Sequence, residues 1–378
     1  MDAPMAVLFT PLTVGDITIA NRIGMSAMTR NRADEARVPS HHMKKYYLQR
    51  ALGGAGLIVT EATLISPQTS QYDRAPGIWS MGQVAGWRKI TNVVHLAGSK
   101  IYCQLWHVGR LTSGKPDGPE PGYGPSAIPA RGGSLCFNFL PVTPEFGTPR
   151  EILDPSTIVT QFKHAARNAK LAGFDGVELH AAAGFLVHQF LDSTSNIRTD
   201  KWGGSSENRA RFGLEVLKSL VEVFGSNVSL KISPGGGFHD MGMPLQETID
   251  TFSYFISEAD KLNLSYITLF RYIPRLDPII DGKKRGTPHD LLSTYGKLIT
   301  NAKIFIVGGV TPEEAEKLVS TNQVHGVFFG TSWLTHPDLA KRIRHGKSIN
   351  NMLAVPHLYG DVDVDPRIGY TDYPAVTY

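Results

Sequence analysis

The sequence predicts an α/β fold, a (β/α)8 TIM barrel, from three observations. About eight short strand-like runs recur along the chain, and most are followed by a helical pattern before the next begins. This alternation is typical of a parallel sheet covered by helices. About eight repeats favour closure into a barrel. An open doubly wound sheet is the weaker alternative, because no Gly-x-Gly-x-x-Gly follows the first strand.

The predicted strands are short, bulky and mainly apolar. In chain order they cover residues 22–28, 57–63, 100–106, 174–180, 228–233, 266–270, 303–307 and 326–330. An amphipathic helix is predicted over residues 155–173, with Asp154 as its cap. Thr311 and Glu314 predict a capping box around Pro312 at the first helical position. These helix starts fall between strands, as a barrel requires.

Two segments stand outside the repeat. Residues 8–19 hold two alternating stretches around Gly15 and Asp16, which predicts an N-terminal β-hairpin that plugs the bottom of the barrel. The connection over residues 111–150, after the third strand, is rich in Gly, Pro and Ser, and loops of this length are usually lids or binding loops. We expect it to cap the barrel mouth. A single barrel can contain 378 residues, so we expect one domain over residues 1–378.

Composition narrows the functional class. The formal net charge of +4 is small for this length, so no nucleic-acid or membrane surface is expected. Two cysteines, Cys103 and Cys136, provide no disulfide framework and no metal-ligand spacing, which suits a reducing compartment. The N-terminal residues lack a basic leader with an apolar core. We therefore expect a cytoplasmic protein without a metal site.

The most informative stretch is residues 174–190, where an apolar run stops at one imidazole, His180. The carboxyl ends of barrel strands face the ligand-binding mouth, so His180 is a candidate catalytic residue. Residues 181–185 supply no side chain that donates or accepts a proton. A catalytic His180 therefore needs partners from other strands. The alternative is a histidine that only satisfies a neighbouring group.

Other strand ends carry further candidates. Gln104 lies in an apolar strand, and an amide that both donates and accepts suits a flavin or nucleobase edge. Lys231 is flanked by apolar residues, which is costly unless an anion or a carboxylate such as Glu61 or Glu178 compensates it. Gly308-Gly309 and Gly330-Thr331 end the last two strands, where barrels commonly bind phosphate. Together these residues suggest a phosphorylated aromatic cofactor.

The chain resembles the Old Yellow Enzyme family of FMN-dependent ene-reductases nearly end to end. The motifs that carry the resemblance are LFTPLTVGDITIANRI, YYLQRA, GLIVTEAT, QLWHVGR, AGFDGVELH, NIRTDKWGGSSENRARFGLEV, FGTSWLTHPDL and GYTDYP. The resemblance implies that Thr29, Gln104 and Lys231 contact the isoalloxazine ring, with backbone contacts from Ala27, Met28 and Ala62. It also implies FMN as cofactor and NADPH or NADH as reductant. Lys231 stands where the family more often has Arg, a mild departure because both are cations.

Three departures from the family pattern are larger. Ala183 replaces the second donor to the substrate carbonyl, and Phe185 replaces the tyrosine that protonates the substrate. Thr331 replaces the arginine of the phosphate clamp. Losing one oxyanion donor typically costs about 10² to 10³ in rate, and losing a positioned general acid about 10² to 10⁴. The Phe185 substitution resembles members of the fungal ergot-type alkaloid branch.

Two functional hypotheses follow. In the first, a flavin oxidoreductase of specialised metabolism passes hydride to or from an activated C=C bond. His180 polarises the acceptor, and Trp106 and Tyr370 shape the pocket with Ala183 and Phe185. In the second, the same barrel catalyses a redox-neutral isomerisation or cyclisation without consuming NAD(P)H. The expected partner is a small-molecule substrate, and the expected assembly is a monomer or homodimer.

Overall fold

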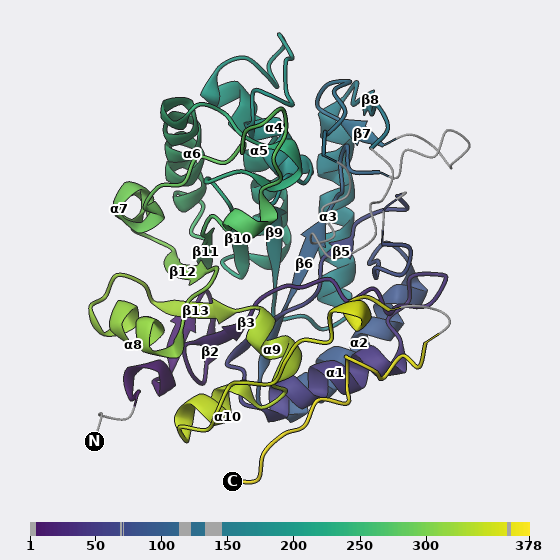
Figure 1. Cartoon of the computed structure of the whole chain (residues 1–378). Helices are drawn as coiled ribbons and strands as arrows, with labels where there is room; N and C mark the ends of the chain where they lie inside the picture. Colours follow the sequence, from purple (N-terminus) through teal and green to yellow (C-terminus); the bar gives the residue numbers. More distant parts are fainter. Residues whose placement is uncertain (1–4, 69, 71, 113–121, 133–145, 361–363) are drawn as a thin grey trace.

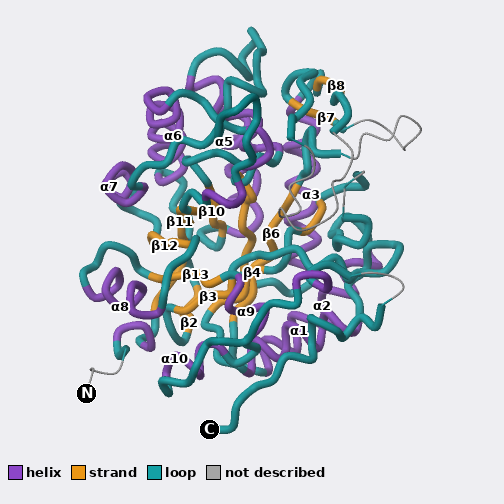
Figure 2. The backbone as a smooth tube through the Cα atoms, viewed as in Figure 1, coloured by secondary structure: helices purple, strands orange, loops and turns teal. Residues whose placement is uncertain are grey.

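Parallel strands close into a barrel at the centre of the molecule (Figures 1 and 2). The computed structural model describes residues 5–68, 70, 72–112, 122–132, 146–360 and 364–378. Within these ranges the barrel has eight parallel strands. They are β3 (Ile23–Met25), β4 (Leu57–Val59), β6 (Lys100–Trp106), β9 (Gly176–Ala181), β10 (Val228–Ile232), β11 (Tyr266–Phe270), β12 (Lys303–Val307) and β13 (Gly326–Phe329). Pairing of β4 with β6 closes the ring, and β5 (Thr63–Leu64) extends the edge of β6. The predicted barrel is confirmed.

Helices surround the strands in the outer layer (Figure 1). The described ones are α1 (His41–Leu52), α2 (Met81–Leu96), α3 (Pro155–Leu171), α4 (Leu186–Leu191), α5 (Ser206–Phe224), α6 (Leu245–Asp260), α7 (Leu291–Tyr295), α8 (Pro312–Ser320), α9 (Thr331–Thr335) and α10 (Leu339–Arg344). In α3, Ile158, Phe162, Ala165 and Ala169 are buried at helical spacing. In the described part of the chain, no helix is both long and apolar enough to cross a membrane.

Helix caps agree with the sequence in part. The Asp154 carboxylate accepts the Ser156 N–H at the start of α3. Thr311 accepts the Glu314 N–H at the start of α8. The Glu314 side chain instead forms an ion pair with Arg271 at 2.7 Å, so the predicted capping box forms only in its Thr311 half. A long-range ion pair has replaced the local bond.

The N-terminal hairpin plugs the barrel as predicted. β1 (Leu12–Val14) pairs antiparallel with β2 (Ile17–Ile19) around Gly15, whose φ of +58° favours glycine. Leu12, Val14 and Ile19 belong to one buried cluster with inward-facing strand residues such as Tyr102. The hairpin therefore replaces water at one end of the barrel and leaves the other end for ligands.

The second predicted strand is shorter than expected and is split into β4 and β5. Polar bonds interrupt it, because the Glu61 carboxylate accepts the backbone N–H groups of Arg30 and Asn31. The fourth, β9, begins at Gly176, and just before it the Asp175 carboxylate accepts the backbone N–H of Ile101.

Of residues 111–150, the structure describes residues 111–112, 122–132 and 146–150, while residues 113–121 and 133–145, including Cys136, lie outside the described residues. β7 (Tyr123–Gly124) pairs in parallel with β8 (Arg150–Glu151). Arg131 forms an ion pair with Asp240, which follows β10. Phe146 joins a buried cluster with Trp106 and Phe185.

Candidate active site

One face of the barrel mouth carries a polar network centred on Gln104. Its Nε2 donates to Oε1 of Glu178 at 2.7 Å, from β6 to the neighbouring β9. A carboxylate only accepts, so this bond fixes the orientation of the amide and leaves Gln104 Oε1 as an acceptor. Burial raises the pKa of Glu178, and the charge of Lys231 lowers it. Glu178 thus positions Gln104, a role that the sequence alone did not reveal.

Lys231 is buried on β10, in register with His180 on β9. Its Nζ donates to Ser26 Oγ at 3.0 Å and lies 5.2 Å from the centre of the Phe270 ring. Burial lowers the pKa of Lys231, and the charge of Glu178 raises it. Of the two carboxylates considered from sequence, Glu178 is therefore the one that compensates Lys231.

The ends of the first and last strands meet at the mouth. Ala27, Met28 and Thr29 are half-buried, and Ala62 is buried. A Cβ placed on Gly330 would lie 3.3 Å from Met28 Sδ. The backbone groups that the sequence assigned to a cofactor ring therefore lie along one edge of the barrel.

Glycines follow both β12 and β13. Gly308 and Gly309 have φ of +112° and +72°, which favour glycine. Among the described residues, a Cβ on Gly309 would meet no atom within 4 Å. Thr331 is exposed at the start of α9. These residues offer backbone N–H groups and one hydroxyl to a phosphate, without an arginine at residue 331.

His180 lies on β9, two residues after Glu178 and beside Lys231 of β10, in an aromatic setting. Its ring centre is 4.8 Å from that of Phe185, which lies 5.0 Å from Trp106. The Ala182 N–H donates to His180 Nδ1 at 3.4 Å, so in the neutral ring Nε2 carries the proton. Burial lowers the pKa of His180 well below its usual value, and the charge of Lys231 lowers it further. His180 is therefore a neutral N–H donor near pH 7.

The turn after His180 has lost its side-chain polarity and is held by its backbone. Ala183 has a φ of +54°, a left-handed conformation that is uncommon for alanine. Its N–H donates to Ser233 Oγ at 2.8 Å, and its carbonyl accepts from His239 Nδ1 at 2.7 Å. Phe185 begins α4. Both anchoring residues, Ser233 and His239, follow strand β10.

His239 is the residue at this site that sequence reasoning missed. Its ring centre is 5.4 Å from Phe185 and 6.1 Å from Phe146. Burial lowers its pKa to about 4, and the bond to the Ala183 carbonyl raises it. The available signal was the glycine run before Phe238, since a glycine-rich loop after a barrel strand commonly reaches the ligand.

Tyr370 lies elsewhere, so the structure does not bring it to the pocket as the sequence interpretation required. Its ring is fully buried and stacks on Tyr46 of α1 with 4.2 Å between centres. Arg30 donates to the neighbouring Gly369 carbonyl and draws this segment inward. Besides Phe185, the ring of Tyr72 approaches Trp106, with 6.1 Å between ring centres, and Tyr72 contacts Tyr359.

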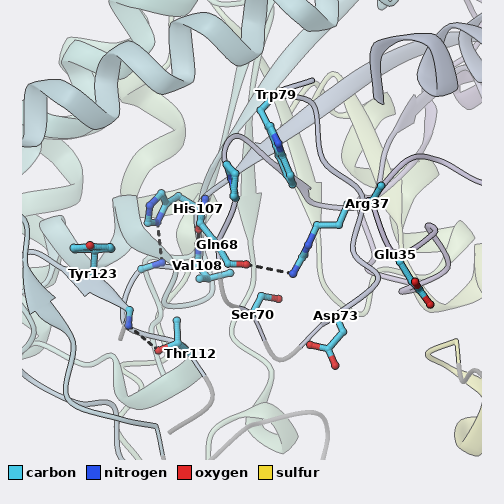
Figure 3. Close-up of a pocket in the computed structure, with 14 residues that line it drawn as sticks. Glu35, Arg37, Gln68, Ser70, Asp73, Trp79, His107, Val108, Thr112 and Tyr123 are labelled. Atoms are coloured by element: carbon cyan, nitrogen blue, oxygen red, sulfur yellow. Dashed lines mark hydrogen bonds between the residues drawn. The ribbon is translucent and has the colours of Figure 1, made fainter. Parts of the chain in front are cut away.

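A cavity of about 560 Å³ opens near this site (Figure 3), and His180 is not one of its lining residues. Arg37, Gln68 and Asp73 line one part of it, and His107 lines another. Gln68 joins these parts, because its carbonyl accepts from Arg37 and its side chain accepts the Val108 N–H. None of its lining residues is a predicted site residue. The strand-end geometry therefore defines the site better than this cavity does.

The arrangement fits a flavin ring better than a metal. Among the described residues, no group of three or more His, Cys, Asp or Glu side chains could hold a metal ion. Two buried polar atoms at the mouth, Trp106 Nε1 and Thr268 Oγ1, have no hydrogen-bond partner in the part of the chain that the structure describes. Thr268 is in register with Lys231. Buried polar groups without partners indicate room for a polar ligand, and Gln104 Oε1 and Lys231 add an acceptor and a cation.

The model of the NADH:flavin oxidoreductase / NADH oxidase family matches residues 7–350. The chain belongs to this family. It is 37% identical to the "Probable inactive reductase easA" of Epichloe festucae var. lolii, over 97% of this chain and 94% of that protein. It is also 37% identical to the "Chanoclavine-I aldehyde reductase fgaOx3" of Penicillium roqueforti, over 98% and 96%. Among solved structures, morphinone reductase matches with a TM-score of 0.85 and 36% identity, covering 98% of this chain and 96% of that one.

The predicted relationship to the Old Yellow Enzyme family, in its fungal alkaloid branch, is confirmed. Membership makes the chain an FMN-dependent oxidoreductase with a nicotinamide reductant. The strand-end set is consistent with this membership, since Gln104 and Lys231 remain at the mouth. The departures at Ala183 and Phe185 lie on the side of His180.

Proposed function

We propose that this family member works in specialised metabolism and transfers hydride between its flavin and an activated C=C bond of a small molecule. The observation that carries the proposal is the placement of Gln104, Lys231 and His180 on the neighbouring strands β6, β9 and β10 of one barrel mouth. When bound, FMN supplies the hydride donor or acceptor. An enone, enal or iminium acceptor suits a site with one neutral imidazole donor.

The chain's own residues have distinct roles. The Gln104 Oε1 acceptor and the Lys231 cation hold the flavin ring edge, and Lys231 favours negative charge there. Ring contacts from Ala27, Met28, Thr29 and Ala62, and phosphate contacts from Gly308, Gly309, Gly330 and Thr331, complete the cofactor site. His180 Nε2–H donates to the substrate carbonyl. The rings of Trp106 and Phe185 exclude water beside it.

A redox-neutral isomerisation or cyclisation on the same barrel is the second candidate. Phe185 favours it, because this ring contacts His180 but has no hydroxyl to protonate a reduced product. A hydride that is returned to the flavin needs no such acid. The relatives' names include both a probable inactive reductase and an aldehyde reductase. NAD(P)H consumption separates the two candidates.

We also propose that the described residues of the 111–150 connection, residues 122–132 and 146–150, belong to a lid over the substrate. The ion pair of Arg131 with Asp240 and the packing of Phe146 near His239 support this role. Membership of a family of flavin enzymes that act on small molecules supports a small-molecule partner. We further propose a cytoplasmic location and a monomeric or homodimeric assembly, which fractionation and light scattering test directly.

Visible absorption and NADPH or NADH consumption together test the function. Protein incubated with excess FMN and desalted should keep the visible flavin bands, with weaker affinity than in relatives that retain the clamp arginine. If the enzyme reduces its substrate, adding the substrate to the reduced enzyme should then oxidise the flavin. For the redox-neutral reaction, product should form without stoichiometric reductant. A desalted protein without visible absorption contradicts the proposal.

A further inference from the structure

His239 lies where the turn after His180 has lost its polar side chains. Its Nδ1 is 2.7 Å from the Ala183 carbonyl oxygen. Its ring centre is 5.4 Å from that of Phe185. Residue 239 therefore touches both positions at which this chain departs from its family's substrate-binding pattern.

The bond to Ala183 determines which nitrogen of His239 is free. A carbonyl oxygen only accepts, so Nδ1 must carry the proton in this contact. In the neutral ring, Nε2 is then a lone-pair acceptor. Nε2 is fully buried and has no partner among the described residues. A buried acceptor is costly to leave unpaired, and such a group at a binding site indicates a missing donor.

The loop holds this imidazole in one orientation. His239 and Asp240 have φ of +51° and +62°, so two consecutive non-glycine residues are left-handed. Asp240 forms ion pairs with Arg131 and Arg285, and Arg110 donates to the His239 carbonyl. Backbone strain persists where its surroundings determine it, and it concentrates at ligand-binding sites.

We infer that Nε2 of His239 binds the substrate by accepting a hydrogen bond from a neutral O–H or N–H group. This inference rests on the proposed function and names a substrate class for it: an activated alkene that also carries a hydroxyl, an amide or a ring N–H. The cation Arg110, whose guanidinium donates to the His239 carbonyl, disfavours an ammonium group. The rings of Phe185 and Phe146 shield the bond from water.

A matched pair of variants separates the two nitrogens. His239→Asn keeps a donor near Nδ1 for the Ala183 carbonyl and removes the acceptor at Nε2, and asparagine tolerates a left-handed φ. His239→Gln places an amide oxygen near Nε2 and gives up the Nδ1 donor. If His239 only supports the turn through its Nδ1 bond, His239→Gln should weaken ligand binding more than His239→Asn does. If His239 Nε2 binds the substrate, His239→Asn should weaken the binding of any ligand with an O–H group more than His239→Gln does.

The probes are cyclohexenones that differ by one O–H group. One compound carries hydroxymethyl on the β-carbon and its match carries ethyl; a second pair carries hydroxyethyl and propyl. Dissociation constants are measured by titration calorimetry with the oxidised, FMN-loaded full chain. The parent should bind at least one hydroxyl compound about tenfold more tightly than its match, as expected for a buried acceptor that gains a donor. His239→Gln should keep part of this preference, and in His239→Asn it should fall to about onefold to twofold.

Equal binding within both pairs by the parent, or a preference that survives in His239→Asn, overturns the inference. If His239→Asn does not fold, the ¹⁵N resonance of His239 Nε2 in the parent decides, since it should shift with the hydroxyl compound and not with its match. FMN loading is measured first by visible absorption. A chain that takes up no FMN contradicts the proposed function, whereas a loaded chain without hydroxyl preference contradicts only this inference.

Discussion

The two sides of the barrel mouth differ in how their polar groups are satisfied. On the cofactor side, Gln104 is hydrogen-bonded to Glu178, and Lys231 on the next strand is hydrogen-bonded to Ser26. On the substrate side, the turn through Ala183 and Phe185 has only backbone polarity, and single histidines supply the rest. The chain therefore keeps polar residues that suit a flavin ring, whereas Ala183 and Phe185 replace two polar side chains with which its family activates the substrate.

Removing His180 should have the largest effect, because it is the donor left on the substrate side. We expect His180→Ala to lower turnover of the protein's own substrate by at least about 10², the usual cost of losing a preorganised donor. Flavin should stay bound, since the cofactor network is untouched. Steady-state kinetics and visible absorption measure the two effects.

His180→Gln is the matched control, because it keeps a donor but cannot titrate, and it should recover part of the loss. If His180→Ala keeps turnover within about threefold of the parent, the loss is well short of that typical for such donors. That result would contradict a catalytic role of His180.

Low pH should destabilise the folded protein through the buried histidines on the substrate side. Burial lowers the pKa of His188 to about 4, whereas the unfolded value is 6.5. Between these values the unfolded chain binds more protons, so this contribution to stability is complete above pH 6.5 and declines as pH falls toward 4. At about 1.36 kcal/mol per pH unit, the titration of His188 lowers the free energy of unfolding by about 2 kcal/mol from pH 6.5 to pH 5.

His188→Asn tests this expectation, since its side-chain oxygen can still accept the Gly184 N–H that His188 Nδ1 accepts. Urea unfolding at both pH values should show the parent losing more free energy of unfolding than His188→Asn. Equal losses in the two proteins would show that His188 titrates normally in the folded state.

Restoring polar side chains at residues 183 and 185 should recover part of the substrate activation that this chain has lost. Ala183→Asn with Phe185→Tyr should raise turnover of cyclohexenone at least about tenfold, since both groups act on one step. The backbone accommodates the first change, because residue 183 already has a left-handed φ of +54° and asparagine tolerates it.

Ala183→Asn alone is the control, and the two effects should not simply add. If a double variant that holds flavin shows no gain, the pocket has changed beyond these two groups.

Loosening the cofactor network should have the smallest effect. In Glu178→Gln, residue 178 can donate as well as accept, so the Gln104 amide loses its fixed orientation and Lys231 loses its nearby negative charge. We expect FMN to bind about fivefold more weakly, the effect of roughly one hydrogen bond. Fluorescence titration of FMN measures this change.

Glu215→Gln, on α5 and outside the barrel, is the control and should bind FMN as the parent does. Unchanged affinity in Glu178→Gln would argue against the positioning role of Glu178.

The sequence by itself determined the barrel, the hairpin and the strand-end positions of Gln104, Lys231 and His180. Each depends on local pattern: alternating apolar residues, helix caps, and polar residues at the ends of apolar runs. Such patterns survive in a single sequence because burial on a strand constrains the strand's own residues. The departures at Ala183 and Phe185 were likewise readable, since they lie within a recognisable motif.

The tertiary structure decided which distant side chains meet. Glu178 rather than Glu61 compensates Lys231, because Glu61 is engaged by backbone N–H groups. Tyr370 is buried against α1 instead of the pocket. His239 reaches the turn after His180 only because β9 and β10 are neighbours and their loops converge. Periodicity carries no information about contacts between loops, so these pairings depend on three-dimensional packing that a single sequence does not encode locally.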